Sequence, residues 1–296
     1  MILYYLFRAF EAFLTRLPQS WQRAIFIAIA HLAYHIDSKH RRVIKQNLRF
    51  AFGHDLTAEE EETISRYCYR NLMLSFYQAI ENNHLSLEAL QTRISIKNRH
   101  ILDDALTKGR KIVFVSAHFG NWELGAAATA RLLMPISAVY KAMNNPWFER
   151  YLLESRSRQG MQMVEKRGAV RHLTKALKSG RAVSLLIDQN TRERDGIEIK
   201  FFGKTARQSA AASFLARKYD ALIIPLVLEE DATGHFTLCL KEPISVAQSD
   251  DSERDIAEAT QKQADVIEAA IRENPKLWFW CHRRWKSEHP EIYKED

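Results

Sequence analysis

The chain has 296 residues, 46% hydrophobic and 27% charged, with a formal net charge of +7. That length suits one large α/β domain, alone or with an appendage, and the composition is that of a globular protein rather than a disordered chain. The positive charge favours an anionic partner: nucleic acid, an anionic membrane surface or a phosphorylated substrate. No nucleic-acid-binding module is recognisable, so we expect no nucleic acid partner.

The three cysteines, Cys68, Cys239 and Cys281, are far apart and lack the spacing of metal ligands. We interpret them as reduced thiols in a cytosolic environment. No zinc or iron motif occurs, and we expect neither a metal nor another cofactor.

The amino-terminal segment combines apolar helices with basic residues. Residues 2–14 and 24–36 are apolar and aromatic, but neither run reaches the roughly 18 uninterrupted apolar residues of a spanning helix. No cleavage site follows them, so we expect no removed signal peptide. The stretch between Asp37 and Asp55 is basic and has no acid. Residues 1–55 are therefore predicted to lie on an anionic membrane surface. Ordinary core helices with a solvated basic face are the alternative.

Residues 58–80 are predicted to form an amphipathic helix with a Thr57 cap. From about residue 93, short β-branched runs alternate with helical stretches. The expected strands are 93–98, 111–118, 136–142, 161–166, 182–188, 198–203, 222–230 and 235–246. Helices are expected over 99–109, 121–133, 146–160, 169–180, 209–220 and 251–273. This alternation predicts an α/β fold, with a mixed, largely parallel central sheet flanked by helices on both faces, over residues 56–296.

The stretch SAHFGNWEL, residues 116–124, places polar groups just after an apolar strand. Active sites in such folds lie beyond the carboxyl ends of the strands, where His118 is expected. Glu123 would lie in the first turn of the next helix and accept a hydrogen bond from the Nδ1–H of His118, leaving Nε2 free as a base. The backbone N–H groups of residues 119–122 would receive an anionic oxygen.

A capping glutamate and a structural histidine also fit this spacing, so the pair alone does not decide between the two. Asn121 is compatible with a site. No alternative nucleophile is evident, because Ser116 lies on the strand rather than in a G-x-S-x-G elbow.

HFGNWE resembles the His-x-x-x-x-acid signature of the lysophospholipid/glycerolipid acyltransferase superfamily. More narrowly, the chain resembles the lipid A biosynthesis acyltransferase family of the lauroyl and myristoyl type. Five further blocks follow in that family's order: VYKAMNNP, LLIDQN, FFGKTARQSAAASFLARK, IIPLVLEE and WFWCHRRWK.

The resemblance implies that His118 is the general base and Glu123 its orienting carboxylate. It also implies substrate contacts by residues of later blocks and by Asn121. Lys141 would contact a phosphate or the carrier, although the family commonly has arginine there, which gives a forked rather than a point charge. Asn144 would line the acceptor site. The residues expected to bind substrate are Asn121, Lys141, Asn144, Asp188, Gln189, Arg283 and Arg284.

Asp188 and Gln189 match the third block by position. The cluster His282, Arg283, Arg284 and Lys286 is expected to hold substrate phosphates, since its two arginines offer forked donors. A solvated or membrane-facing terminus is the alternative.

The resemblance implies a peripheral enzyme on the cytoplasmic face of the cell inner membrane. It would move a fatty acyl chain from an acyl carrier protein thioester, or from acyl-CoA, to a hydroxyl of a lipid A precursor without an acyl-enzyme. The chain lacks a PEGTR-like motif, which argues against glycerol phosphate as the acceptor. The alternatives are another lipid acceptor (a lysophospholipid, a glycolipid or a polyene lipid), a thioesterase-like hydrolase and a non-catalytic lipid-binding protein.

Overall fold

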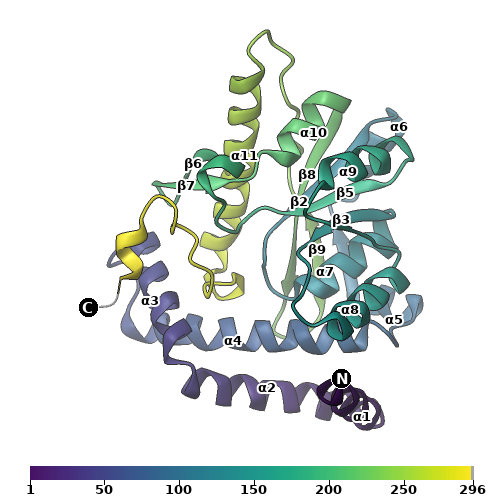
Figure 1. Ribbon diagram of the computed structural model, residues 1–296, viewed down its shortest axis with the longest axis vertical. Coiled ribbons are helices and arrows are strands. Elements are labelled where there is room, and N and C mark those ends of the chain that lie inside the picture. Colours follow the sequence, from purple (N-terminus) through teal and green to yellow (C-terminus); the bar gives the residue numbers. More distant parts are fainter. Residues whose placement is uncertain (295–296) are drawn as a thin grey trace.

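A seven-stranded sheet forms the centre of the computed structural model, which describes residues 1–294 (Figure 1). The strands are β1 (Ile94–Lys97), β2 (Lys111–Ser116), β3 (Ile136–Tyr140), β4 (Gln162–Glu165), β5 (Ala182–Leu186), β6 (Ile197–Phe201), β7 (Lys204–Gln208), β8 (Ala221–Glu230) and β9 (Phe236–Leu240). The α-helices are α1 (Ile2–Leu14), α2 (Gln19–Ile36), α3 (Ser38–Phe52), α4 (Ala58–Glu81), α5 (Leu87–Arg93), α6 (His100–Thr107), α7 (Trp122–Ala128), α8 (Pro146–Arg158), α9 (Ala169–Lys178), α10 (Ala211–Tyr219) and α11 (Ser252–Glu273).

The sheet is mixed and largely parallel, as the sequence predicted. Its strand order is β1-β9-β8-β2-β5-β3-β4, and β6 and β7 form a separate hairpin. Strands β8, β2, β5, β3 and β4 all run in one direction. Strand β9 runs antiparallel to β8, and β1 pairs in parallel with β9, so the reversed pair forms one edge.

Helices cover both faces of the sheet. Successive residues of a strand point to opposite sides, and in the central strands the residues on both sides are apolar and need to be buried. In β2, Val113 and Val115 belong to a buried cluster with residues of α9, α10 and α11, whereas Ile112 and Phe114 belong to one with residues of α6 and α7. A strand buried on both faces reads as a continuous apolar run, which is why KIVFVS was recognisable in the sequence.

The amino-terminal helices lie beneath the sheet in Figure 1, where α2 packs along the long helix α4. Ile44 and Leu48 of α3 belong to the same buried cluster as Val113, so α3 contributes to the main core. Within residues 1–294, no helix combines the length and the apolar character needed to cross a bilayer. Association of residues 1–55 with a membrane surface therefore stays a prediction.

The sequence did not predict three elements. The basic segment after residue 37 forms helix α3, residues 87–93 form the short helix α5, and residues 204–208 form strand β7. Strand β7 was missed because its hairpin turn is Phe202-Gly203, both with positive φ, and a phenylalanine is an unusual residue for such a turn.

Candidate active site

The register of two central strands brings His118 and Asp188 together. Strands β2 and β5 are parallel neighbours in which Ser116 pairs with Leu186, and the N–H of Ile187 donates to the carbonyl of Ser116 at 2.9 Å. The two polar residues follow this pair at the carboxyl edge of the sheet. Helix α7, after β2, covers one face, and α10, after β5, covers the other. Ligands of open α/β sheets bind at such a point of divergence.

Asp188 holds the imidazole of His118 by two contacts. Nδ1 of His118 lies 2.9 Å from Oδ1 of Asp188, and the backbone N–H of His118 donates to Oδ2 at 3.0 Å. The indole N–H of Trp278 also donates to Oδ2, at 2.8 Å. Asp188 is only 4% exposed, so these donors replace the water that its carboxylate lacks.

This contact fixes the tautomer of the histidine. An ionised carboxylate can only accept, so Nδ1 carries the proton and Nε2 presents a lone pair. The side-chain amide of Gln189 is the neighbour of that nitrogen, with its Nε2 3.4 Å from Nε2 of His118. The His118 side chain is 18% exposed. Its Nε2 is therefore placed to accept a proton from a hydroxyl.

The same pairing shifts both pKa values. Burial by itself would lower the pKa of His118, but the charge and hydrogen bond of Asp188 outweigh it, and the net pKa lies above 6.5. Burial would raise the pKa of Asp188, but His118 and the indole N–H of Trp278 together lower it to about 2. The carboxylate therefore stays ionised at neutral pH, and the histidine is a stronger base than a free imidazole.

The carboxy-terminal segment closes over the loop that carries His118. The N–H of Gly120 donates to the carbonyl of Leu277 at 2.7 Å, and the N–H of Phe279 donates to the carbonyl of His118 at 2.9 Å. Gly120 has a φ of +57°, and a Cβ there would lie 2.8 Å from the carbonyl oxygen of Leu228. Glycine is required at this position because the backbone turns tightly against β8.

Two aromatic rings flank the imidazole. The ring centroids of Trp122 and Phe279 lie 5.3 Å and 6.2 Å from that of His118, and 5.7 Å from each other. The imidazole therefore lies beside an apolar wall. Such surroundings suit a reactive group that is carried on a hydrocarbon chain.

Glu123 does not make the orienting contact predicted for it, because Asp188 occupies Nδ1 of His118. Glu123 does lie in the first turn of α7, as expected, but its carboxylate binds the Arg156 guanidinium of α8 at 2.5 and 3.2 Å. Both side chains are largely buried, and their charges reach His118 with opposite effects on its pKa. The carboxylate belongs to a buried ion pair beside the site.

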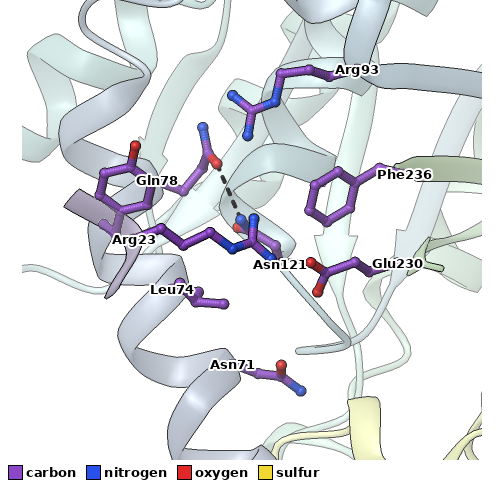
Figure 2. Close-up of a pocket in the computed structure, with 9 residues that line it drawn as sticks. Arg23, Asn71, Leu74, Gln78, Arg93, Asn121, Glu230 and Phe236 are labelled. Atoms are coloured by element: carbon purple, nitrogen blue, oxygen red, sulfur yellow. Dashed lines mark hydrogen bonds and ion pairs between the residues drawn. The ribbon is translucent and has the colours of Figure 1, made fainter. Parts of the chain in front are cut away.

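Asn121 caps α7. Its Oδ1 accepts from the N–H of Leu124 at 3.2 Å, and its Nδ2 donates to Oε1 of Gln78 at 3.1 Å. Figure 2 shows this side chain beside a small cavity that Arg23 and Glu230 also line. The cavity measures about 10 Å³, which leaves room for no more than one water molecule. The expected substrate contact by Asn121 stays a prediction.

Arg284 is also structural. It is fully buried, and its guanidinium donates to the carbonyls of Gln189 and Arg207 at 3.0 and 2.5 Å. It lies over the ring of Phe201, 5.1 Å from the centroid, and burial lowers its pKa to about 10. A guanidinium held by two carbonyls inside the core cannot reach a substrate phosphate. Arg283, by contrast, lines a surface cavity.

Two of the four backbone amides expected to receive an oxyanion are already used. The N–H of Phe119 donates to the carbonyl of Ala117 at 2.8 Å, and that of Gly120 is taken by Leu277. The loop thus uses these amides for its own conformation.

A family model described as bacterial lipid A biosynthesis acyltransferase matches residues 1–287, nearly the whole chain. The chain belongs to this family. It is thus an acyltransferase of the lipid A biosynthesis type.

Three relatives show how broad the similarity is. A lipid A biosynthesis acyltransferase of Haemophilus influenzae is 23% identical over 93% of this chain and 87% of that protein. A lipid A biosynthesis lauroyltransferase of Escherichia coli is 28% identical over 64% of this chain and 60% of that protein. A phosphatidylinositol mannoside acyltransferase of Mycolicibacterium smegmatis is 25% identical over 61% and 59%.

In this acyltransferase, Lys141 and Asn144 follow β3 at the same edge of the sheet as Asp188, since β3 and β5 are parallel neighbours. Both side chains are exposed, and neither has a polar partner within residues 1–294. Their roles in substrate binding stay predictions, as does that of Gln189.

Sequence reasoning missed the functions of Arg156 and Trp278. Nothing in the sequence around Arg156 indicates its partner, because its pairing with Glu123 depends on how α8 packs. The carboxy-terminal block WFWCHRRWK was recognised, but nothing in its letters says which indole reaches Asp188.

Proposed function

We propose that this acyltransferase moves a fatty acyl chain from an acyl carrier protein thioester to a hydroxyl of a lipid A precursor. His118 acts as the general base and Asp188 as its orienting carboxylate, without an acyl-enzyme. The observation that carries the proposal is the imidazole bound by a buried aspartate through Nδ1, in a side chain that is 18% exposed and whose Nε2 has no carboxylate partner among residues 1–294.

The reaction follows from that geometry. Nε2 of His118 takes the proton of the acceptor hydroxyl as its oxygen attacks the thioester carbonyl carbon. A C–O bond forms, the C–S bond breaks, and the leaving thiolate takes the proton back from His118. Asp188 stabilises the imidazolium between these steps and stays ionised throughout. No protein nucleophile takes part.

Gln189 is our candidate for polarising the thioester carbonyl. Its amide is exposed and lies at Nε2 of His118 in the free protein, so the incoming hydroxyl must displace it. The displaced N–H groups can then donate to the developing oxyanion, a contact that the amides of Phe119 and Gly120 cannot make.

The basic surface of α9 supports an acidic carrier protein as the donor. Residues 166–187 contain no acid. The exposed basic side chains of this stretch are Lys166, Arg167, Arg171, Lys175 and Lys178. Helix α9 lies toward the opposite end of the molecule from α1 and α2, so a soluble carrier there would not compete with a membrane that contacts those helices (Figure 1).

The exposed side chains of α1 and α2 support a location at the inner membrane, on its cytoplasmic face. They include Ile2, Leu6, Phe13, Trp21, Leu32 and Ile36. Large apolar groups gathered on two adjoining helices are suited to the boundary between headgroups and acyl chains. Replacing Trp21 with glutamate should weaken co-sedimentation with anionic vesicles, and unchanged co-sedimentation of Trp21→Glu and of Leu6→Glu would contradict this placement.

A glycolipid acceptor is the second candidate, favoured by the similarity to the phosphatidylinositol mannoside acyltransferase. Both candidates use the same base and donor, so the choice of acceptor distinguishes them.

The test uses purified protein in detergent with a labelled acyl carrier thioester or acyl-CoA, and either a lipid A precursor or a phosphatidylinositol mannoside. Wild type, His118→Ala and His118→Gln are compared, with products identified by mass. We expect acylated lipid A precursor from wild type and a loss of about 10²–10⁴ in rate in both variants.

If only the phosphatidylinositol mannoside is acylated, the proposed acceptor is wrong and the mannoside takes its place. If acyl-CoA is the better donor, the proposed carrier protein donor is wrong. Free fatty acid without an acylated acceptor would indicate a hydrolase. An unchanged rate in both His118 variants would overturn the mechanism.

A further inference from the structure

A basic cavity of about 330 Å³ opens between α3 and the carboxy-terminal segment. Its polar lining consists of Lys39, His40, Asn190, His282, Arg283 and Lys286. We call it the basic cavity. Its residues come from three parts of the chain that are far apart in sequence, so its shape is set by the fold.

The wall formed by the carboxy-terminal segment is tied to α3 through Asn47. Its buried amide Nδ2 donates to the carbonyls of Trp280 and His282 at 2.7 and 2.8 Å, and its Oδ1 accepts from the hydroxyl of Tyr293 at 2.6 Å. A fully buried amide with three partners is a rigid connection. Arg283 follows directly, with its guanidinium 5.6 Å from the ring centroid of Tyr293.

The third wall is the loop that follows the catalytic aspartate. Asn190 exchanges two hydrogen bonds with Ser287, through its Nδ2 at 2.9 Å and its Oδ1 at 3.2 Å. One residue, Gln189, separates Asn190 from Asp188, and the charges of Asp188 and His118 both act on His282. The basic cavity therefore adjoins the active site.

The charges in the cavity are uncompensated. Lys39, Arg283 and Lys286 form no ion pair with any residue in the range 1–294, and no carboxylate lines the cavity. Burial lowers the pKa of His282 to about 4, so this ring is neutral at pH 7 and offers hydrogen bonds rather than charge. Among residues 1–294, the one carboxylate in contact with a lining residue is that of Asp37, which lies 2.7 Å from Nδ1 of His40.

We propose that the basic cavity binds the phosphate group of a substrate while His118 acts on the acyl acceptor. Two ammonium groups and one guanidinium supply charge and forked donors together. They are therefore better matched to a phosphate ligand than to a ligand with a single carboxylate. The volume exceeds that of a phosphate alone, so part of the group that carries it also enters. This inference rests on the proposed acyl transfer.

The phosphate has two possible sources, the headgroup of the lipid acceptor and the phosphodiester that joins the donor's thiol arm to its carrier. In either case the contact is made at a part of the substrate that does not react. It should therefore contribute to binding in the ground state and the transition state alike, and its loss should raise KM more than it lowers kcat.

The test compares Lys39→Gln/Lys286→Gln with Lys108→Gln/Lys262→Gln, a control with the same loss of charge at two exposed lysines outside the cavity. Each protein is assayed with a phosphorylated acceptor and the same acceptor after phosphatase treatment. Each is also assayed with the acyl carrier thioester and with an acyl-pantetheine thioester that lacks phosphate. Arg283→Gln and Arg283→Lys serve as a second pair, in which lysine should restore part of the binding.

We expect the cavity double variant to raise the KM of one phosphorylated substrate by about ten- to a hundredfold, with no matching change for its phosphate-free form. The substrate affected identifies the source of the phosphate. Equal losses with and without phosphate, or losses no larger than in the control, would overturn the proposal. So would weaker binding to anionic phospholipid vesicles with unchanged KM values, which would indicate a membrane contact instead.

A binding measurement separates this inference from the proposed reaction. The phosphorylated acceptor and the acyl carrier are each titrated into His118→Ala, with and without the two cavity substitutions. If no acylation is found but affinity still falls with the cavity variants and only for a phosphorylated ligand, the reaction is wrong and the cavity stands. If acylation is found and affinity does not change, the cavity proposal fails alone.

Discussion

Two buried carboxylates lie beside the catalytic loop, and they have different partners. Glu123 is five residues from His118 in sequence but pairs with Arg156 of α8. Asp188 is seventy residues away but binds His118 through both its ring and its backbone N–H. Proximity along the chain therefore did not determine which acid binds His118. The register of β2 against β5 did, since it fixes Ser116 opposite Leu186.

This difference implies different effects of removing each carboxylate. In the proposed mechanism Asp188 acts through His118, so its removal should affect the rate. Glu123 pairs with a buried guanidinium, so its removal should mainly affect stability.

Asp188→Asn should cause the largest loss of activity. An asparagine can donate to Nδ1 and so favour the tautomer whose proton is on Nε2, which removes the base. We expect kcat to fall by about 10²–10⁴. Product formation under single-turnover conditions measures this, with Glu123→Gln as the matched control. A larger fall in Glu123→Gln than in Asp188→Asn would reverse the assignment of the two acids.

Arg156→Ala should destabilise the protein most. It leaves the carboxylate of Glu123, which is 7% exposed, without its guanidinium. Breaking a buried ion pair in this way costs about 3–5 kcal/mol, whereas Arg156→Met/Glu123→Leu, which removes both charges, should recover much of that. Urea unfolding of Arg156→Ala, of the single variants Arg156→Met and Glu123→Leu, and of the double variant tests this. Additive losses in the double variant would mean that the two side chains are not coupled.

Trp278→Phe should have an intermediate effect, because it keeps an aromatic ring in the core but removes the indole N–H that donates to Asp188 at 2.8 Å. A hydrogen bond to a charged group contributes about 1.5–3 kcal/mol, so we expect a ten- to hundredfold loss in kcat or an equivalent loss of stability. Trp280→Phe is the control, since its indole donates to the carbonyl of Pro275 instead. Equal rates in the two variants would show that the indole contact does not support the site.

The sequence was sufficient for the architecture but only for part of the site. Long apolar runs such as β2 and β8 predict buried parallel strands because both of their faces are covered. Arg284 was a reasonable phosphate ligand from its type, yet its carbonyl partners come from loops that only the folded chain brings together. Strand order and register depend on packing between distant segments, so the partner of His118 could not be derived from spacing.

The smallest expected effect is a shift in pH dependence, and it separates the two roles of the His118–Asp188 pair. His118 must be unprotonated to accept a proton, so kcat/KM should rise with pH and reach half its maximum above pH 6.5, because Asp188 raises the pKa of the histidine. In Asp188→Asn the residual activity should reach half its maximum at lower pH, because that charge is gone. If the pH of half-maximal activity is the same in wild type and in Asp188→Asn, the rise of activity with pH is not set by the histidine.

The stability contributed by the same pair should fall as pH rises through neutrality, whereas the activity rises. The raised pKa of His118 contributes stability that is complete below about pH 6.5 and is lost as pH rises through the folded-state value. The lowered pKa of Asp188 contributes stability above about pH 3.8 that is lost as pH falls toward about 2. The difference in unfolding free energy between wild type and Asp188→Asn should therefore be largest between these limits and shrink above them, where activity is highest. Urea unfolding of both proteins from pH 4 to pH 9 measures this difference. If the difference instead grew as activity rose, the carboxylate would support the site by packing rather than by its charge.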